Sequence, residues 1–517
     1  MAKYKDYCYA QDKFIPVSFA KQILPGTFEY TLSHVIEQEL DLSAFDACYQ
    51  NDETGAPAYD PRILLKVVLF AYSRGIFTSR RIEQACRENV LFMALSADSQ
   101  PHWTTVADFI SSRHEEIAVL FQEVLLVCDS LGLLGKELFA VDGCKMPSNA
   151  AKEWSGTHAD LRRKQQKLQR VVRVMLERHR QEDGAGMAQE SIRTREQQYL
   201  QTVRQRARKI KTFLASQPEN RGPKGTVRQS NITDPNSAKM KTSQGVVQGY
   251  NGVAAVAAKH QVIVAAQAFG EGQEHGLLRP MVEAVRERFQ QLGEETDIFK
   301  RARLTADAGY HTEANMQYVF DQDSDAYIAD RSMRKRDPRF AEAARHKQRS
   351  RRERQQRAGH SRLFRPSDFH YDAKQRTGTC PAGKQLYRNG SHITVGGWTG
   401  VKFTAPKSAC LPCPLRAQCL RTPDQTPVRR VVFLQGRAPN APETFTAKMQ
   451  RKIDSVLGKL IYGRRLATAE PPFADIRHAK GLHRFTLRGR DKVNGQWRLY
   501  RIVHNLFKVH RFAEGFT

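Results

Sequence analysis

The chain has 517 residues, more than one hydrophobic core usually serves, so several domains are expected. Lysine and arginine number 82 against 54 aspartates and glutamates, and the resulting net charge of +28 points to a polyanionic partner. Apolar residues make up 40% of the chain, which excludes a disordered or fibrous protein. Charged residues interrupt every long apolar run, so no membrane span is expected. The first residues carry no apolar signal segment, which predicts a cytoplasmic protein with reduced cysteines.

Residues 1–135 are predicted to form an all-helical N-terminal domain. Pro61 begins a segment with apolar residues at helical spacing that Gly75 ends, and Thr105 to Asp108 resembles a capping box at the start of a helix continuing past Ile117. Basic side chains near the helix ends would suit DNA phosphates, although a solvated helix surface explains them equally well.

Residues 136–330 are predicted to form a mixed sheet with crossover helices. Apolar strands are expected at 138–141, in a hairpin within 245–269, at 303–306 and at 326–329, with helices at 277–292 and 312–320. Two amphipathic helices at about 158–215 form an inserted antiparallel hairpin in this prediction. Their basic residues could follow DNA or be solvated.

Two acidic residues directly follow apolar strands in this region. Asp142 comes after the strand at 138–141, and Asp307 comes after the strand at 303–306. Side chains at strand ends of open α/β sheets converge on ligands, and paired carboxylates suit divalent cations in phosphodiester transfer. By themselves, however, such aspartates usually cap turns.

A third acid occurs near the C-terminus. Glu470 precedes Pro471 and Pro472, which predicts that a helix begins at Glu470. Arg477 follows seven residues later on the same helix face, while Tyr462 and Arg465 lie just upstream. An acid flanked by guanidinium groups suits a phosphodiester, but a surface helix with a charge pair gives the same pattern.

Several stretches in chain order together carry a family resemblance. They are Tyr59 to Lys66 with Ser79 to Ile82, Ala140 to Gly143, Thr233 to Pro235 with Gln248 to Asn251, Thr305 to Tyr310, Tyr462 to Arg477, and Leu487 to Gly489 with His504-Asn505. As a set they resemble bacterial insertion-sequence DDE transposases with a ribonuclease-H-like core, an N-terminal helical domain and a Tyr-Arg-Glu-Lys signature.

The resemblance implies roles for these residues. Asp142, Asp307 and Glu470 would hold two catalytic Mg²⁺ ions. Tyr462, Arg465 and, at the signature's lysine position, Arg477 would contact DNA phosphates. Asp475 is the alternative third acid. The expected partners are duplex DNA, as element terminal repeats and as target, and a second copy of the chain in the DNA complex. The implied activity is DNA cleavage and joining of the 3′-hydroxyl ends to target DNA, at the nucleoid of a bacterial cytoplasm.

Residues 331–455 form a predicted basic and cysteine-rich insertion between Asp307 and the C-terminal helical part of the core, residues 456–517. Residues 331–365 hold 14 Lys or Arg against 3 acids, which suits DNA contact or a solvated linker. A group of four cysteines follows, and four thiolates suit a structural Zn²⁺ in a small zinc-ribbon-like fold, with buried thiols or an iron-sulfur cluster as alternatives. These cysteines are Cys380, Cys410, Cys413 and Cys419.

Two other functions stay open on sequence grounds. One is a transposase-derived regulator that binds DNA but has lost catalysis, against which the three acids argue. The other is a ribonuclease-H-like nuclease acting on RNA or hybrids, against which the N-terminal helical domain argues.

Overall fold

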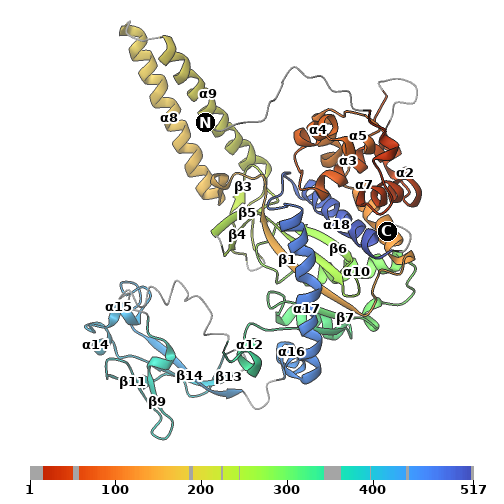
Figure 1. Cartoon of the computed structure of the whole chain (residues 1–517). Coiled ribbons are helices and arrows are strands. Elements are labelled where there is room, and N and C mark those ends of the chain that lie inside the picture. The colour runs from red at the N-terminus through yellow and green to blue at the C-terminus, as the bar shows by residue number, and fades with distance from the viewer. Residues whose placement is uncertain are drawn as a thin grey trace, which may run out of the picture. The chain divides into compact units, whose positions relative to one another are not determined.

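The computed structural model describes residues 16–49, 57–185, 190–222, 225–243, 245–342, 363–395, 398–437 and 442–513. For residues 182–185, 190–193 and 437 it describes the backbone only. The chain divides into two compact units, one of Met1–Arg331 with Met449–Thr517 and one of Ser332–Lys448 (Figure 1). Most of the predicted Arg-rich segment, residues 343–362, lies outside the described residues. Within the described part, no helix is long and apolar enough to cross a membrane.

A mixed six-stranded sheet forms the centre of the first unit. Its order is β4-β5-β1-β7-β8, with β6 also paired to β5. β5 runs antiparallel to β1, β4 and β6, whereas β7 is parallel to both β1 and β8. This arrangement agrees with the predicted mixed α/β class. The strands are β1 (Leu138–Pro147), β4 (Ala238–Thr242), β5 (Gly245–Ala257), β6 (Ile263–Phe269), β7 (Arg303–Ala306) and β8 (Asp325–Ile328), and a separate pair joins β2 (Ser155–Gly156) to β3 (Ser230–Asn231).

Strand β1 is longer than predicted. The expectation that it ends before Asp142 is wrong, because β5 continues to pair with it as far as Pro147. The parallel partner β7 stops pairing at Val141, opposite Ala306. Asp142 therefore lies inside a strand, one residue beyond the point where β7 ends.

Helices cover both faces of this sheet. Phe139 of β1 packs edge-on against Phe289 of α10 (Leu278–Gln291), whereas its neighbour Leu138 packs with Ile461 of α17 (Val456–Ala474). Because successive strand residues face opposite sides, α10 and α17 lie on opposite faces. Helix α18 (Arg490–Phe512) packs on β6, and α11 (Glu313–Asp321) packs against α10. The helix α16 (Phe445–Asp454) precedes α17.

The N-terminal helices share their core with α18. Tyr72 stacks on Tyr500 with ring centroids 4.4 Å apart, and Phe28 stacks on Phe507 at 3.9 Å. Helix α18 is therefore buried between the sheet and the N-terminal helices, as Figure 1 shows. These helices are α1 (Phe28–His34), α2 (Ser43–Asp46), α3 (Pro61–Ser73), α4 (Ser79–Glu88), α5 (Val90–Leu95), α6 (Trp103–Ser112) and α7 (Glu116–Ser130).

One helix boundary in this region differs from the prediction. Instead of one helix starting at Thr105 and running past Ile117, α6 begins at Trp103 and ends at Ser112, and α7 follows. The side chain of His102 caps α6 by accepting the N–H of Thr104, so Thr105 is already inside the helix.

The predicted helical hairpin is present as α8 (His158–Ala185) and α9 (Glu190–Ser216), which pack along each other (Figure 1). Leu161, Ile210 and Phe213 form a buried cluster at its base. Tyr199 of α9 is 53% exposed.

The second unit is a small β-rich fold. Its strands follow the order β12-β13-β11-β10-β9, with β14 also paired to β13. Phe369, Val401, Phe403 and Val431 form its hydrophobic core together with Cys410. Its elements are α12 (Met333–Arg336), β9 (His370–Asp372), β10 (Thr377–Thr379), β11 (Gln385–Arg388), β12 (Ile393–Val395), β13 (Trp398–Thr404), α14 (Lys407–Cys410), α15 (Arg416–Cys419) and β14 (Arg430–Arg437).

Helix α17 does not begin at Glu470 as predicted. It begins at Val456, where Ser455 Oγ accepts the N–H of Gly458 at 3.0 Å, and it passes through Pro471 and Pro472. Proline has no N–H, so Pro471 leaves the carbonyl of Ala467 without its helical donor. Gln261, in the turn between β5 and β6, donates its Nε2 to that carbonyl at 2.8 Å. A side chain from the sheet thus replaces the lost helical hydrogen bond.

Replacing Gln261 by alanine should lower the free energy of unfolding by about 1–2 kcal/mol, because it removes this hydrogen bond and the one from Lys508 Nζ to Gln261 Oε1. Residue 261 has φ +61°, and alanine meets the same backbone cost there as glutamine. Thermal unfolding measures the effect, with the exposed Gln290→Ala on α10 as control. Equal Tm values for the two variants would contradict this account of the proline-containing helix.

A buried polar cluster fixes the segment after α17, a π-helical turn η7 (Asp475–Ala479). Asp475 Oδ2 accepts hydrogen bonds from Lys480 Nζ and, at 2.9 Å, from His504 Nδ1 of α18. Burial by itself would raise the pKa of Asp475, but these two donors bring it down to about 2. Asp475, the alternative third acid of the sequence analysis, is therefore bound by Lys480 and by His504, and the bond to His504 ties η7 to α18.

This cluster predicts a pH-dependent stability. Because the pKa of Asp475 in the folded state lies below its ordinary value of 3.8, its contribution to the free energy of unfolding is fully present above about pH 4 and is lost as pH falls towards 2. Asp475→Asn leaves the buried Lys480 without its charge partner and should lower Tm at pH 7. The Tm difference from wild type should stay constant from pH 7 to about pH 5 and shrink below about pH 4. A Tm difference between Asp475→Asn and wild type that grows on acidification would contradict this role of Asp475. The control is Asp321→Asn, at an exposed position.

Candidate active site

Asp142 lies half-buried in β1 and has a basic partner. Its Oδ2 accepts a hydrogen bond from Arg465 Nη1 at 2.9 Å, and its Oδ1 accepts the N–H of Gly143 at 2.8 Å. Burial raises the pKa of Asp142, the guanidinium of Arg465 opposes this rise, and the charge of Asp307 adds to it. The carboxylate therefore lies in a poorly solvated place beside a second acid.

Asp307 directly follows β7 and lies beside Asp142. Thr305 of β7 pairs with Ala140 of β1, so the two aspartates come two residues later at corresponding positions. Asp307 Oδ1 accepts the N–H of Gly309 at 2.9 Å. The structure thus brings together two of the acids that the sequence singled out.

Arg465 and Tyr462 come from the first half of α17. Arg465 is only 7% exposed, and its guanidinium lies 5.7 Å from the centroid of the Tyr462 ring. With one guanidinium nitrogen bonded to Asp142, Arg465 neutralises an acid instead of standing free in solvent. Arg477, by contrast, is exposed on η7.

Glu470 lies further along α17 than Tyr462 and Arg465. It is exposed and makes no hydrogen bond or ion pair with the residues that the structure describes. Five residues after Arg465, it points about 140° around the helix axis from it. Across the described ranges, no group of three or more His, Cys, Asp or Glu side chains is arranged closely enough to hold a metal ion.

Glu274 approaches the two aspartates instead, and sequence reasoning missed it. It lies in the glycine-containing loop between β6 and α10, and it is half-buried. Burial and the nearby charge of Asp307 both raise its pKa, whereas Lys145 lowers it. In the sequence, Glu274 is an acid near glycines between a predicted strand and a predicted helix. This pattern is too common to identify Glu274 as a site residue.

Two buried polar side chains adjoin these acids. Asn251 of β5 donates its Nδ2 to Glu274 Oε1 at 3.4 Å, while its Oδ1 has no hydrogen-bond partner in the described part. The hydroxyl of Tyr310 is likewise buried without a partner there. Burial raises the pKa of Tyr310, and the charges of Glu274, Asp142 and Asp307 raise it further.

A groove borders the same loop. It encloses about 740 Å³ and is formed by residues 220, 226, 228 and 229, the start of β4 and the loop at 270–276. Arg228, Lys239 and His275 contribute to its wall together with Glu271. The groove thus brings basic side chains next to the loop that carries Glu274.

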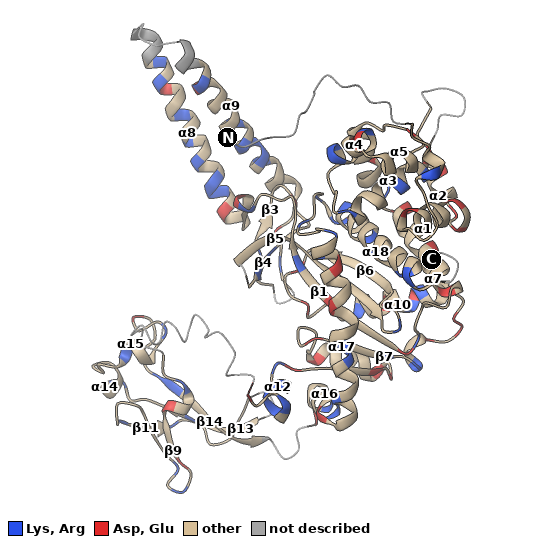
Figure 2. Ribbon diagram, in the orientation of Figure 1, with Lys and Arg blue, Asp and Glu red and all other residues tan. Residues whose placement is uncertain are grey.

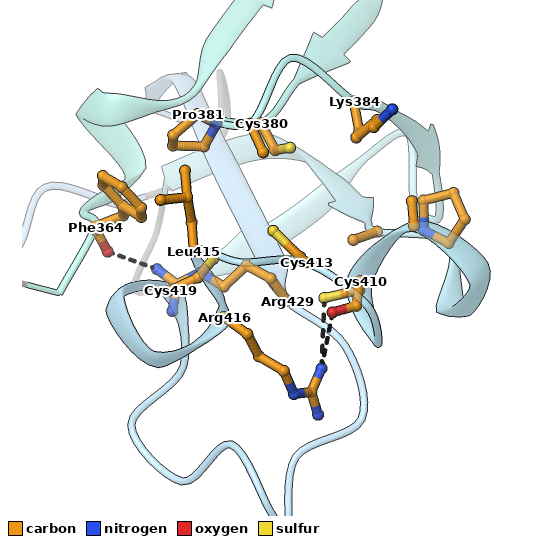
Figure 3. A pocket seen from close by; sticks show the side chains of 14 residues that line it. Phe364, Cys380, Pro381, Lys384, Cys410, Cys413, Leu415, Arg416, Cys419 and Arg429 are labelled. Atoms are coloured by element: carbon orange, nitrogen blue, oxygen red, sulfur yellow. Dashed lines mark hydrogen bonds between the residues drawn. The ribbon is translucent and has the colours of Figure 1, made fainter.

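The four cysteines of the second unit line one cavity of about 30 Å³ (Figure 3). Burial raises the pKa of Cys419, and the charges of the other three cysteines add to this rise. Arg416 fixes the loop beside them by donating to the carbonyls of Pro423 and Thr426 at 2.7 and 2.8 Å. The structure therefore gathers Cys380, Cys410, Cys413 and Cys419 in one place.

Comparison with known proteins gives two family matches. Residues 17–112 match a transposase domain, DUF772, and residues 379–510 match a transposase DDE domain. No curated protein matches the chain. The first match covers helices α1 to α6, and the second runs from the cysteine-rich unit through α17 and most of α18. Together these matches to transposase domains support an insertion-sequence DDE transposase.

Proposed function

We propose that this transposase binds the ends of its own element, cleaves the DNA there and joins the freed 3′-hydroxyl ends to target DNA. The observation that carries the proposal is the pairing of Asp142 and Asp307 at adjacent strands, with the guanidinium of Arg465 bonded to Asp142. The proposed setting is the DNA of a bacterial cytoplasm.

The strand order supports a ribonuclease-H-like core for the first unit. Counted without the short β4, the strands read β6-β5-β1-β7-β8, with β5 antiparallel to its neighbours and β7 and β8 parallel to β1. This is the order 3-2-1-4-5 with the second strand reversed, which is the arrangement that the resemblance implies. In it the first and fourth strands are adjacent, Asp142 lies in the first, and Asp307 directly follows the fourth.

The donor atoms at this place fit Mg²⁺. The carboxylates of Asp142 and Asp307 and the unpaired Oδ1 of Asn251 offer only oxygen, which Mg²⁺ prefers. Two Mg²⁺ ions held by Asp142, Asp307 and Glu470, when bound, would activate the attacking oxygen and stabilise the leaving oxygen of a phosphodiester. Arg465 limits the negative charge at Asp142. Tyr462 and the exposed Arg477 are proposed to contact phosphates of the bound DNA.

The basic charge is proposed to bind duplex DNA. Figure 2 shows Lys and Arg repeated along both helices of the hairpin α8 and α9 and on α4. Many of these side chains are exposed, so they can approach phosphates without a desolvation cost. Because two element ends must be joined to one target, we propose that the DNA complex contains two copies of the chain.

The cysteine cluster is proposed to hold a structural Zn²⁺. Four thiolates from one small fold suit tetrahedral zinc, and the Cys410 and Cys413 pair has the spacing of a zinc knuckle. The four sulfur atoms would have to move closer to reach zinc at about 2.3 Å. The metal would then hold together α14, α15 and the turn at Cys380 in a unit with a small hydrophobic core.

Removing one acid should abolish DNA processing while leaving DNA binding. With a duplex carrying the sequence that flanks the reading frame and Mg²⁺, Asp142→Asn or Asp307→Asn should lower cleavage and strand transfer by about 100-fold or more, because a metal ligand supplies several kcal/mol. Glu470→Gln should have a similar effect. The exposed Asp321→Asn is the control. Gel mobility shift measures binding separately.

The outcomes of this assay also separate the alternatives. A wild-type protein that binds the duplex and neither cleaves nor joins it would indicate a regulator. Faster cleavage of an RNA–DNA hybrid than of duplex DNA would indicate a nuclease. Equal activity in wild type and all three variants would contradict the proposed roles of the acids.

Metal analysis tests the zinc proposal. The purified wild-type chain should contain about one zinc per chain, and Cys413→Ser should lose it and lower the Tm of the cysteine-rich unit. The control Cys48→Ser, in the N-terminal helices, should retain the zinc. Iron in place of zinc, or an unchanged zinc content in Cys413→Ser, would contradict the proposal.

A further inference from the structure

We infer that Glu274 is a further carboxylate of the cation site, acting with Asp142 and Asp307 and held in place by Asn251. The inference rests on the proposed function, since it adds a ligand to the metal site proposed there. Glu274 is not one of the three DDE acids, which are Asp142, Asp307 and Glu470.

The first support is the packing at Gly309. A Cβ at this position would overlap Glu274 Oε2 and lie 3.0 Å from Asp307 Oδ1. The carboxylates of Glu274 and Asp307 therefore face the same small volume, which is open only because residue 309 is glycine. Gly309 also donates its N–H to Asp307 Oδ1, so one glycine serves both acids.

The second support is the pair of unpartnered polar atoms around Gly143. A Cβ at Gly143 would lie 3.0 Å from Asn251 Oδ1 and 3.4 Å from the hydroxyl of Tyr310. Both side chains are fully buried, and neither of these two atoms has a hydrogen-bond partner among the described residues. A buried oxygen without a donor costs about 1–3 kcal/mol, which a bound cation or its water ligands would offset.

The third support is the charge balance. Arg465 pairs with Asp142, but neither Glu274 nor Asp307 has a basic group within ion-pair distance in the part of the chain that the structure describes. Lys145 acts on Glu274 only through its charge. The charges of Glu274, Asp307 and Asp142 act on one another, and a divalent cation with oxygen ligands that drew these carboxylates closer together would remove their repulsion.

Asn251 fixes the orientation of Glu274. Its amide donates to Glu274 Oε1, and its backbone is held in β5 by pairing with Lys145 of β1 and Phe269 of β6. The loop carrying Glu274 follows β6 directly, so the sheet positions both partners. Glu274 thus reaches the aspartates from the side of α10, whereas Arg465 reaches Asp142 from α17.

The test measures Mn²⁺ binding to the full-length protein by electron paramagnetic resonance, without DNA and without turnover. The thiol cluster is a soft-ligand site that takes up little Mn²⁺, so this ion reports on the acids. Glu274→Gln should weaken Mn²⁺ binding at least 10-fold, as Asp307→Asn should. The matched control is Glu287→Gln, an exposed glutamate on α10 that should bind as wild type does.

Two further variants guard against misfolding as the cause. Glu274→Asp keeps a carboxylate and should recover part of the affinity lost in Glu274→Gln. Gly309→Ala should weaken Mn²⁺ binding in the wild-type background and have a smaller effect when combined with Glu274→Ala, which vacates the space. Thermal unfolding confirms that each variant is folded.

The result also distinguishes this inference from the proposed function. If Asp142→Asn and Asp307→Asn weaken Mn²⁺ binding and Glu274→Gln does not, the inference is overturned and the proposed metal site stands. If none of the three variants changes Mn²⁺ binding, the site itself is wrong and the inference falls with it.

Discussion

The unequal neighbours of β1 determine where Asp142 and Asp307 come together. β7 pairs with β1 only from Leu138 to Val141, whereas β5 stays paired through Pro147. From Asp142 onward β1 therefore has a partner strand on one side alone within the described structure. Asp142 and Asp307 lie together at the end of β7. The end of β7 leaves space for the carboxylate of Asp307, whereas Asp142 is held rigidly in the continuing strand β1.

Helix α17 depends on the same sheet, because it must cross the sheet to bring Arg465 to Asp142. Its path through two prolines and a π-helical turn would be costly in isolation. The sheet offsets this cost through Gln261, and α18 offsets it through the contact of His504 with Asp475. Helix α18 can do this because it is itself buried between the sheet and the N-terminal helices. The N-terminal helices thus support the acidic site indirectly, by fixing α18.

Local signals in the sequence predicted the strands and helices of the core well. The hairpin at 245–269 and the strand before Asp307 follow directly from apolar runs and turn residues. Where a partner strand decides the outcome, the prediction failed: nothing near Asp142 indicates that β5 would extend β1 by several residues. The start of α17 failed for a similar reason, because the hydrogen bond that tolerates Pro471 comes from a residue more than two hundred positions away.

Long-range contacts also explain stretches of the resemblance that have no chemistry of their own. Gly489 adopts φ +84° at the start of α18 and donates its N–H to Asp234, which also accepts the hydroxyl of Tyr250. Asn505 makes two hydrogen bonds to the backbone of Ile263, which ties α18 to β6. These motifs hold the sheet and its helices together. Their spacing in the sequence could signal a family, but only the fold gives them a physical role.

The two sources proposed for further carboxylates, Glu470 and Glu274, do not compete. Each Mg²⁺ takes about six oxygen ligands, so two ions need more donors than three carboxylates supply, and water and phosphate oxygens provide the rest. Glu274 lies on the side of α10, near Asp307, while Glu470 belongs to α17, which contacts the opposite face of the sheet. With acids on both sides, the proposed cation at Asp307 would keep Glu274 as a ligand whichever way the exposed Glu470 points. In a chain of net charge +28, this local group of acids sets the proposed cation site apart from the lysines and arginines proposed to bind DNA.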